Sequence, residues 1–385
     1  MPIKPTGAAP AMAMARSAFA AALLAALAAC MPSDAQEPAG EDAAEPILVP
    51  TEMCRGYWFV PITLAPREGY PEDRTLWFLY DTGASDSFVD PESLNRVTGR
   101  RFDAGMRANI RDATAGPVNF NRLTARVMDM DHLSIALGRE IDGILEVDAF
   151  EDFLLTLDYA DEEMRLERGN LPRPDGEAIF DANGPDMRPW LPVRVDGRRV
   201  RVLIDSGSGS TFSFNRIERY DLLGEPVAVR SSTRIDRLER RNGARLDGEL
   251  TFGPYVMENP VLLETPGTQL FGSPVMRHFE WTFDQRRERV RLTPYAEDTV
   301  LPSPAFRGHG LESWGANGVL EVRGVIPDSP ADRAGVRAGD RITHWNGLPV
   351  ADRGCASPGG ENIVLTLLRE DAQIDVELEI FALID

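Results

Sequence analysis

The chain has 385 residues, 43% of them hydrophobic, and a formal net charge of -20 at pH 7. This length exceeds one ordinary domain and allows two or three domains with their own cores, and the hydrophobic content is typical of a globular chain. The negative charge argues against nucleic acid as a partner, because a phosphate-binding surface needs clustered Lys and Arg, and here the Arg residues are interspersed with acids.

Residues 1–29 are predicted to be a signal peptide. Basic residues precede an apolar run over residues 17–29, which is too short to span a bilayer. The run ends in the letters LAAC at residues 27–30, a pattern that resembles the bacterial lipobox. That resemblance implies that Cys30 is lipidated and, because Met31 follows it, that the exported protein is anchored to an outer membrane and faces the periplasm. The alternative is a plain secretory signal in which the Cys is incidental.

Residues 30–50 are predicted to form a flexible tether that begins at the lipidated Cys. They are acidic, rich in Pro and poor in aromatic residues, which opposes a packed core. The lipoprotein pattern implies several acyl chains on one Cys, and more than one chain gives stable anchoring. The membrane is therefore an expected partner through Cys30.

Two parts of the remaining chain repeat one another. An apolar strand pattern runs into Asp-Thr-Gly at Asp81, and a second such pattern runs into Asp-Ser-Gly at Asp205. Farther on, residues 144–166 align without a gap to residues 270–292, an offset of 126 residues against 124 between the two Asp residues. An offset held so closely predicts two copies of one structural unit.

Each copy is predicted to be a β-rich lobe, the first over residues 51–170 and the second over residues 171–299. Short β-type runs bounded by Gly, Pro, Asn and Asp dominate both copies. Helical periodicity is scarce, with one short candidate helix at residues 91–97. The fold is therefore predicted to be mainly β and bilobal.

The two Asp-containing turns are the candidate catalytic site. If the turns face each other, Asp81 and Asp205 lie within a few ångströms, cannot both ionise easily and share one proton. The ionised member can then take a proton from water while the other donates to a carbonyl oxygen. A single such turn is more simply a polar β-turn, but two matching copies favour the pair. The loop residues expected to support it are Thr82, Gly83, Ser85, Ser206, Gly207 and Ser208.

Neither a metal nor another cofactor is expected, since water activated by two carboxyl groups needs neither. The four histidines are scattered without ligand spacing, so packing or surface roles are expected for them.

Across about residues 55–297 the chain resembles the retropepsin-like and pepsin-like aspartic peptidases, with both half-sites on one chain. The resemblance implies a bilobal fold, protease activity and an extended polypeptide substrate lying across a cleft. It also implies a hairpin flap over the cleft, expected at residues 113–120 or at residues 241–244 of the second lobe.

The first copy departs from the family pattern beside its Asp loop. Glu146 stands where the second copy has Gly272, so a side chain must fit there. Ala84 corresponds to Ser208, and only the Ser hydroxyl can donate to an ionised carboxylate and lower its pKa. The carboxyl pair is therefore expected to titrate higher than one supported by hydroxyls on both sides.

Residues 300–385 resemble a bacterial PDZ domain. The pattern includes GHGL at residues 308–311 and SPA at residues 329–331, where Ser329 suits a helix N-cap. In that family a peptide partner binds between the strand after the GHGL-type loop and a second helix. Gly and Pro crowd the segment between residues 346 and 363, so one wall of this groove is expected to be lacking.

These features predict an exported aspartic endopeptidase, a hydrolase of extended or misfolded polypeptides, with a PDZ-like domain. The alternative is a non-catalytic peptide-binding or scaffold lipoprotein that uses the same fold. After Cys30, the two remaining cysteines are Cys54 and Cys355. An even number in an oxidising compartment favours a disulfide between them, the alternative being two unpaired thiols.

Overall fold

The computed structural model describes residues 45–355 and 362–385. The expected signal peptide, the lipidation of Cys30 and most of the expected tether lie outside the described residues. Among the residues that are described, no helix is long and apolar enough to cross a membrane.

The end of the expected tether is a strand, so the prediction of a flexible segment up to residue 50 is wrong there. β1 (Ile47–Val49) pairs antiparallel with β10 (Glu163–Glu167). Val49 is buried in the main hydrophobic core, and its burial favours the strand over a solvated linker.

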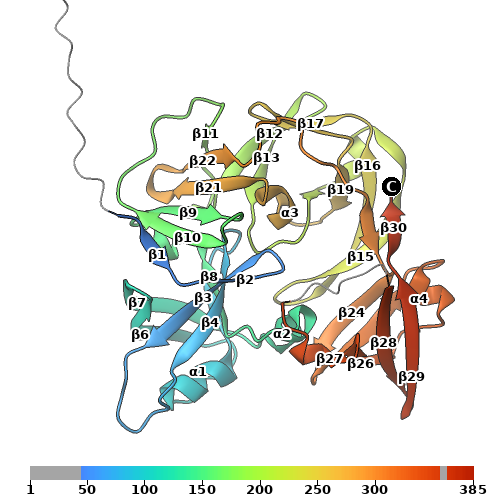
Figure 1. Ribbon diagram of the computed structural model, residues 1–385, viewed down its shortest axis with the longest axis horizontal. Coiled ribbons are helices and arrows are strands. Elements are labelled where there is room, and N and C mark those ends of the chain that lie inside the picture. The colour runs from blue at the N-terminus through green and yellow to red at the C-terminus, as the bar shows by residue number, and fades with distance from the viewer. Residues whose placement is uncertain (1–44, 356–361) are drawn as a thin grey trace, which may run out of the picture. The chain divides into compact units, whose positions relative to one another are not determined.

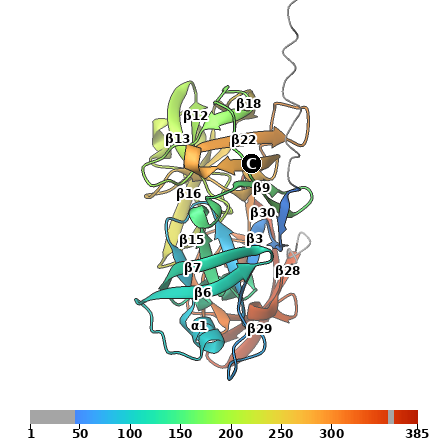
Figure 2. The same ribbon diagram turned by 90° about the vertical axis from the view of Figure 1, so that its left-hand side faces the viewer.

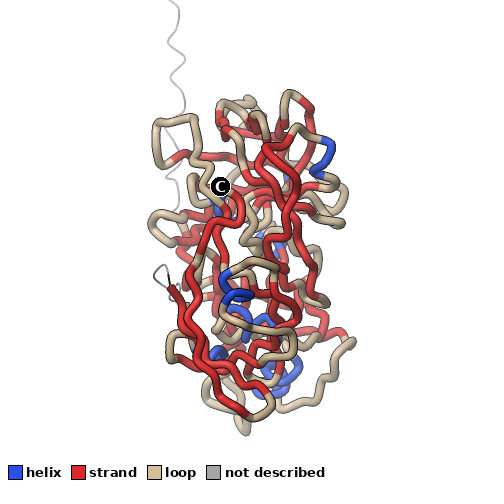
Figure 3. Tube along the Cα trace, turned by 90° about the vertical axis from the view of Figure 1, so that its right-hand side faces the viewer, coloured by secondary structure: helices blue, strands red, loops and turns tan. Residues whose placement is uncertain are grey.

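The described chain is mainly β, as expected, and its α-helices are short (Figures 1 and 3). The helix predicted at residues 91–97 is confirmed as α1 (Pro91–Thr98). The Asp90 carboxylate accepts hydrogen bonds from the backbone N–H groups of Glu92 and Ser93 at its start, and Gly99 ends it at φ 59°. The other α-helices described are α2 (Asp131–Leu137), α3 (Ser273–Met276) and α4 (Pro330–Arg333).

The first copy folds around a seven-stranded sheet in the order β2-β3-β4-β8-β5-β7-β6. A hairpin of β6 and β7 is prominent in Figure 2. The strands are β2 (Glu52–Cys54), β3 (Tyr57–Leu64), β4 (Thr75–Asp81), β5 (Ser87–Val89), β6 (Arg107–Ala115), β7 (Val118–Val127) and β8 (Gly143–Glu146).

The second copy folds around a nine-stranded sheet in the order β15-β16-β19-β14-β20-β13-β12-β17-β18. The parallel pair of β13 and β20 repeats the parallel pair of β4 and β8, so the repeat in the sequence is also a repeat in strand pairing. The strands are β12 (Trp190–Val195), β13 (Arg198–Ile204), β14 (Phe212–Phe214), β15 (Leu222–Thr233), β16 (Leu238–Leu246), β17 (Glu249–Phe252), β18 (Tyr255–Glu258), β19 (Val261–Glu264) and β20 (Leu270–Phe271).

A third sheet, in the order β1-β10-β9-β21-β22-β11, takes strands from both copies. Its middle strands β9 and β21 pair with each other, and the Thr156 and Thr282 hydroxyls meet there at 3.0 Å. These residues are 126 positions apart, the same offset as in the aligned sequences, so each meets its own counterpart. The further strands are β9 (Leu154–Asp158), β11 (Ile179–Asp181), β21 (Phe279–Asp284) and β22 (Arg289–Pro294).

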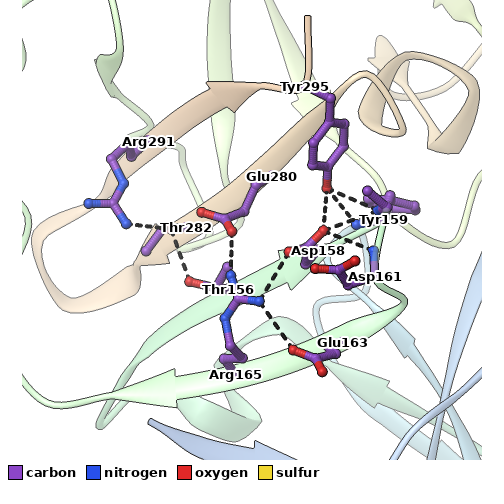
Figure 4. Close-up of polar contacts among 11 residues, drawn as sticks. Thr156, Asp158, Tyr159, Asp161, Glu163, Arg165, Glu280, Thr282, Arg291 and Tyr295 are labelled. Atoms are coloured by element: carbon purple, nitrogen blue, oxygen red, sulfur yellow. Dashed lines mark hydrogen bonds and ion pairs between the residues drawn. The ribbon is translucent and has the colours of Figure 1, made fainter. Parts of the chain in front are cut away.

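Polar side chains reinforce this shared sheet (Figure 4). Arg165 of β10 forms ion pairs with Asp158 of β9 and Glu280 of β21. The Tyr295 hydroxyl donates to Asp158 at 2.8 Å and accepts from the backbone N–H of Tyr159 at 2.7 Å. The two copies are thus joined by backbone pairing and by side chains from both.

The C-terminal domain has a sheet in the order β24-β25-β26-β28-β29. The Ser329 hydroxyl accepts from the backbone N–H of Asp332, which confirms Ser329 as the N-cap of α4. Within the described residues between 346 and 362, the helical structure is the short turn η4 (Val350–Asp352). The strands are β24 (Leu311–Ala316), β25 (Val319–Val325), β26 (Arg341–Trp345), β27 (Leu348–Pro349), β28 (Asn362–Arg369) and β29 (Ala372–Glu379).

A two-stranded ribbon connects this domain to the second copy. β23 (Phe306–Gly308) pairs with β30 (Phe381–Ile384). Side chains of both strands pack on a small cluster formed by Val229, Val261 and Leu263. The chain end therefore returns to the β15–β16 hairpin.

Candidate active site

Asp81 ends β4, and Asp205 directly follows β13. β4 alternates Leu76, Phe78 and Tyr80 into the core, and all three are fully buried. Each Asp-bearing strand also has a parallel partner, β8 or β20, on one side. The apolar strands therefore fix the backbone just before each carboxyl group.

The two loops interlock through the residue after each Asp. The Thr82 hydroxyl donates to the carbonyl oxygen of Ile204 at 2.7 Å and accepts from the backbone N–H of Ser206 at 2.9 Å. In mirror fashion, the Ser206 hydroxyl donates to the carbonyl oxygen of Tyr80 and accepts from the backbone N–H of Thr82, both at 3.0 Å. Four buried hydrogen bonds thus hold the loops in one mutual position.

Glycine lets the carboxyl groups approach. A Cβ atom on Gly83 would lie 2.5 Å from Cγ of Asp205, and one on Gly207 would lie 2.4 Å from Cγ of Asp81. The backbone N–H of Gly83 also donates to Oδ1 of Asp81 at 2.7 Å. Each loop glycine therefore packs directly against the carboxyl group of the other loop.

This contact predicts that Gly83→Ala displaces the Asp205 carboxyl group. Any activity of the pair should then fall by about tenfold to a hundredfold, since small misplacements of reacting groups carry costs of that size. Gly267→Ala is the matched control, because it lines the same cleft and its added Cβ would meet only the Thr265 hydroxyl at 3.8 Å. Equal rates for the two variants in a peptide-cleavage assay would contradict the prediction.

The two carboxyl groups are electrostatically unequal. Burial, followed by the charge of Asp81 and a hydrogen bond with it, raises the pKa of Asp205 well above its ordinary value. Burial also raises the pKa of Asp81, but hydrogen bonds from Gly83, Asp205 and Gly207 and the charge of Arg188 oppose this. The pair therefore retains one shared proton at pH values where an isolated Asp would be ionised, and the charge of Asp81 adds to the rise at Asp205.

Arg188 is a site residue that the sequence did not reveal. Its Nη1 donates to the carbonyl oxygen of Gly83 at 2.8 Å, and its guanidinium forms an ion pair with Asp186. Arg188 belongs to the second copy, and it thus holds the Asp81 loop of the first copy in place. The residue lies outside the aligned parts of the repeat, so no internal comparison could single it out.

Two of the three serines expected to support the loops, Ser85 and Ser208, line the cleft. The Ser208 hydroxyl accepts from the backbone N–H of Ser210 at 3.2 Å. Oδ1 of Asp205 is buried and has no hydrogen-bond partner among the described residues. The hydrogen bond expected from Ser208 is therefore not formed to this oxygen.

Both carboxyl groups open into a cleft of about 930 Å³. Its walls come from both copies and carry apolar side chains on either side of the pair. Those from the first copy include Leu79, Phe88, Met128, Leu133, Leu137, Ile141 and Ile144, and those from the second include Leu203, Ile235 and Leu270. Such a cleft has the size and lining of a ligand site.

The hairpin over the cleft is β15–β16, and its tip lies at residues 233–238. The backbone N–H of Arg234 donates to the carbonyl oxygen of Arg237 at 2.7 Å to close the turn. Ile235 at the tip packs on an apolar cluster that includes Leu133. The flap expected near residues 241–244 is thus the correct hairpin, but these residues lie within β16 rather than at its tip, and residues 243–245 pair with β19 in the sheet.

The other expected flap position, residues 113–120, is wrong. A Cβ atom on Gly116, at the tip of the β6–β7 hairpin, would lie 2.4 Å from Cδ of Pro50. β3 pairs with β6 through Thr63 and Thr114, which directs this hairpin toward the start of the described chain. Its tip does not line the cleft.

Glu146 fits beside the Asp81 loop without displacing it. Its carboxyl group and the Ser87 hydroxyl are hydrogen-bonded at 3.2 Å, and the same hydroxyl accepts from the backbone N–H of Glu146. At Gly272 a Cβ atom would lie 2.0 Å from the carbonyl oxygen of Ser208, so no side chain fits there. Burial and the charge of Asp148 raise the pKa of Glu146 to about 6.

The raised pKa predicts that Glu146 destabilises the protein when it is ionised. Because the folded-state pKa exceeds the ordinary 4.5, stability falls as pH rises through the window from about 4.5 to 6. Glu146→Gln should therefore raise the free energy of unfolding at pH 7 by about 1 kcal/mol, allowing for solvent screening, and change it little at pH 4. Denaturant titrations at both pH values test this, with Glu249→Gln at an exposed position as the control. An equal rise in the free energy of unfolding of Glu146→Gln at pH 4 and pH 7 would refute it.

Cys54 and Cys355 form a disulfide with a Cα–Cα separation of 4.7 Å. Cys54 follows the start of the first lobe, whereas Cys355 belongs to the C-terminal domain. The bridge therefore attaches that domain to the first lobe.

One group of carboxylates in the described chain has a spacing that could suit a metal ion: Asp90, Asp129 and Asp131. Asp90 already accepts three backbone hydrogen bonds, from Glu92, Ser93 and Met130. These bonds account for its position as part of the α1 cap and the loop before α2.

Comparison with known proteins identifies the C-terminal domain. Residues 321–369 match the PDZ domain family, so the chain is a mainly β protein that contains a PDZ domain. The chain is also 38% identical over 65 residues to the periplasmic serine endoprotease DegP of Escherichia coli, in strain K12 and in O157:H7. That match covers 15% of this chain and 14% of DegP, within the PDZ region. It therefore does not bear on the carboxyl pair.

Proposed function

We propose that this protein is an aspartic endopeptidase that hydrolyses extended or misfolded polypeptides. The observation that carries the proposal is the hydrogen-bonded pair of half-buried Asp81 and buried Asp205, which lines a cleft between the two repeated parts of the chain. The interlocked hydroxyls of Thr82 and Ser206 support it, since they hold the two Asp loops in one mutual position. The proposed fold class is accordingly the bilobal aspartic-peptidase fold.

In the proposed mechanism, ionised Asp81 accepts a proton from a water molecule bound between the two carboxyl groups. Protonated Asp205 donates to the oxygen of the scissile carbonyl group, and the water oxygen attacks its carbon to give a tetrahedral intermediate. The assignment follows from the higher pKa of Asp205. The N–H of Gly83 and the charge of Arg188 keep Asp81 the stronger acid.

The substrate class follows from the shape and lining of the cleft. Its volume of about 930 Å³ and its walls of apolar and charged side chains suit several residues of an extended polypeptide. A compact substrate would need to unfold first, because the carboxyl groups lie beneath the β15–β16 hairpin. We place the protein outside the cytoplasm, held through lipidated Cys30, on the basis of the N-terminal pattern and of the periplasmic location in the name of DegP.

The proposal predicts a bell-shaped pH profile for cleavage. Activity requires one proton on the pair, so it falls when Asp81 becomes protonated and again when Asp205 becomes ionised. Because burial raises the pKa of Asp81 above its ordinary 3.8, the acidic limb should lie above that pH. Digestion of a denatured protein by the full chain from pH 2 to 9 tests this. A rate still rising below about pH 3 would contradict it.

A non-catalytic peptide-binding or scaffold role is the alternative, and Glu146 favours it. Its side chain lies beside the Asp81 loop where the second copy has Gly272, so the two Asp loops have different surroundings. The two functions differ in one measurement. A binding protein would retain a bound denatured polypeptide intact after long incubation, whereas a peptidase would fragment it.

A further inference from the structure

Helix α2 of the first lobe lies against the PDZ domain. It contacts both β24, the edge strand of the PDZ sheet, and η4, the short turn in the position of a second helix. PDZ domains bind extended peptides by adding a strand at a sheet edge, beside a helix. The segment that lies in this position here belongs to the same chain.

The contact is close-packed. Ile135 of α2 is buried in the hydrophobic core of the PDZ domain, together with Leu311, Leu320 and Val350. A Cβ atom on Gly315 would lie 2.6 Å from the carbonyl oxygen of His132, so β24 carries glycine where the helix backbone approaches. The PDZ core is thus completed by a side chain from the first lobe.

Hydrogen bonds fix the end of the helix to the same domain. Nη2 of Arg353 donates to the carbonyl oxygens of Ile135 and Ala136 at 2.9 and 2.7 Å, and the backbone N–H of Gly354 donates to the carbonyl oxygen of Gly138 at 2.8 Å. Arg353 is only 9% exposed. An arginine buried to satisfy these carbonyl groups stabilises the C-terminus of α2, where free carbonyls need partners.

The opposite side of α2 contacts the hairpin over the cleft. Leu133 and Leu137 line the cleft and pack in the cluster that contains Ile235 of the hairpin tip. Nε2 of His132 is hydrogen-bonded to the carbonyl oxygen of Arg234 at 3.0 Å, while its ring stacks on Trp314 of β24 at 4.4 Å. One short helix therefore joins the PDZ domain to the hairpin tip.

The hairpin also contacts the PDZ domain directly. Arg240 of β16 forms an ion pair with Glu312 of β24 at 2.9 Å, and Glu312 is buried. Strand β15 also lies against β24 and β30. The tip and the body of the hairpin are thus both attached to the same domain.

We propose that the PDZ domain takes helix α2 as a built-in ligand and, through it, holds the β15–β16 hairpin closed over the carboxyl pair. Its groove is then an internal interface rather than an open receptor for the C-terminus of another protein. Release of α2 from the PDZ domain and opening of the hairpin are one coupled event. This coupling does not depend on whether the carboxyl pair cleaves peptides.

Hydrogen–deuterium exchange of the full chain tests the coupling without any cleavage assay. Trp314→Ala and Ile135→Ala each remove a side chain from the contact between α2 and the PDZ domain. Each variant should speed amide exchange about tenfold in α2 and by the same factor at residues 233–238 of the hairpin tip. Exchange in β3 and β4 should not change. Val364→Ala, at an exposed position of β28 in the same domain, should change neither segment.

Two outcomes would overturn the proposal. Faster exchange in α2 with an unchanged hairpin tip would show that the helix does not transmit the loosening. Faster exchange at the tip in Val364→Ala would show that any weakening of the PDZ domain has this effect. If Ile135→Ala unfolds the domain, exchange will also rise throughout β28. The comparison then rests on two milder variants, Trp314→Ala at a half-buried position and Ile135→Val. Ile135→Val should exchange at the wild-type rate.

Discussion

Asp81→Asn and Asp205→Asn are each expected to reduce cleavage of a denatured protein by about 10²–10⁴-fold, the usual contribution of general acid–base catalysis. One remaining carboxyl group cannot both accept the water proton and donate to the carbonyl oxygen. The double variant should therefore be no worse than either single variant, because residues that act as a unit give non-additive losses. Fragment release measured by gel and mass spectrometry gives all three rates.

The same variants should keep their fold. Each replaces an acid whose pKa is raised by desolvation with a neutral side chain of similar size, so the cost of desolvating a charge disappears. Circular dichroism and thermal melts should match those of Asp103→Asn, a control at an exposed position of the first lobe. Substantial cleavage by either single variant of the pair would exclude a mechanism that requires both carboxyl groups.

The central geometry of the site could be anticipated because both halves carry the same local signal. An apolar strand, an Asp, a hydroxyl residue and a glycine follow one another in each copy, and the hydroxyls of Thr82 and Ser206 indeed reach across to the opposite loop. The 126-residue offset likewise reappears as the contact of Thr156 with Thr282. Repeats are readable in this way because equivalent residues lie at equivalent places around a local twofold axis.

The hairpin tip could not be placed from the repeat because the two copies differ where their hairpins pair. In the first copy, pairing of Thr114 with Thr63 directs the hairpin away from the cleft. In the second copy, β15 is twelve residues long and pairs with β16 through two register shifts, which extend it to a tip at residues 233–238. Register depends on pairing partners and bulges, which a periodic pattern of apolar residues does not determine.

The role of α2 was hidden for a different reason. Ile135 reads as one apolar residue in a short helix, and nothing local indicates that it completes the core of a domain nearly 200 residues away. Within the described residues after Asn346 the helical structure is the short turn η4, as the Gly and Pro residues there predict. What fills the resulting space is a tertiary contact, and single-sequence patterns carry no information about such contacts.

Removing the disulfide is expected to cost about 2–5 kcal/mol in the free energy of unfolding, because Cys54 and Cys355 close a loop of 301 residues that contains both lobes. The folded structure should persist, since Arg353 and the N–H of Gly354 still hold α2 to the PDZ domain. The test is guanidinium denaturation of Cys54→Ala/Cys355→Ala beside the wild type, each with and without reductant. Reductant should lower the wild-type midpoint to that of the double variant and leave the double variant unchanged. Equal midpoints for the oxidised and reduced wild type would show that the bridge contributes nothing to stability.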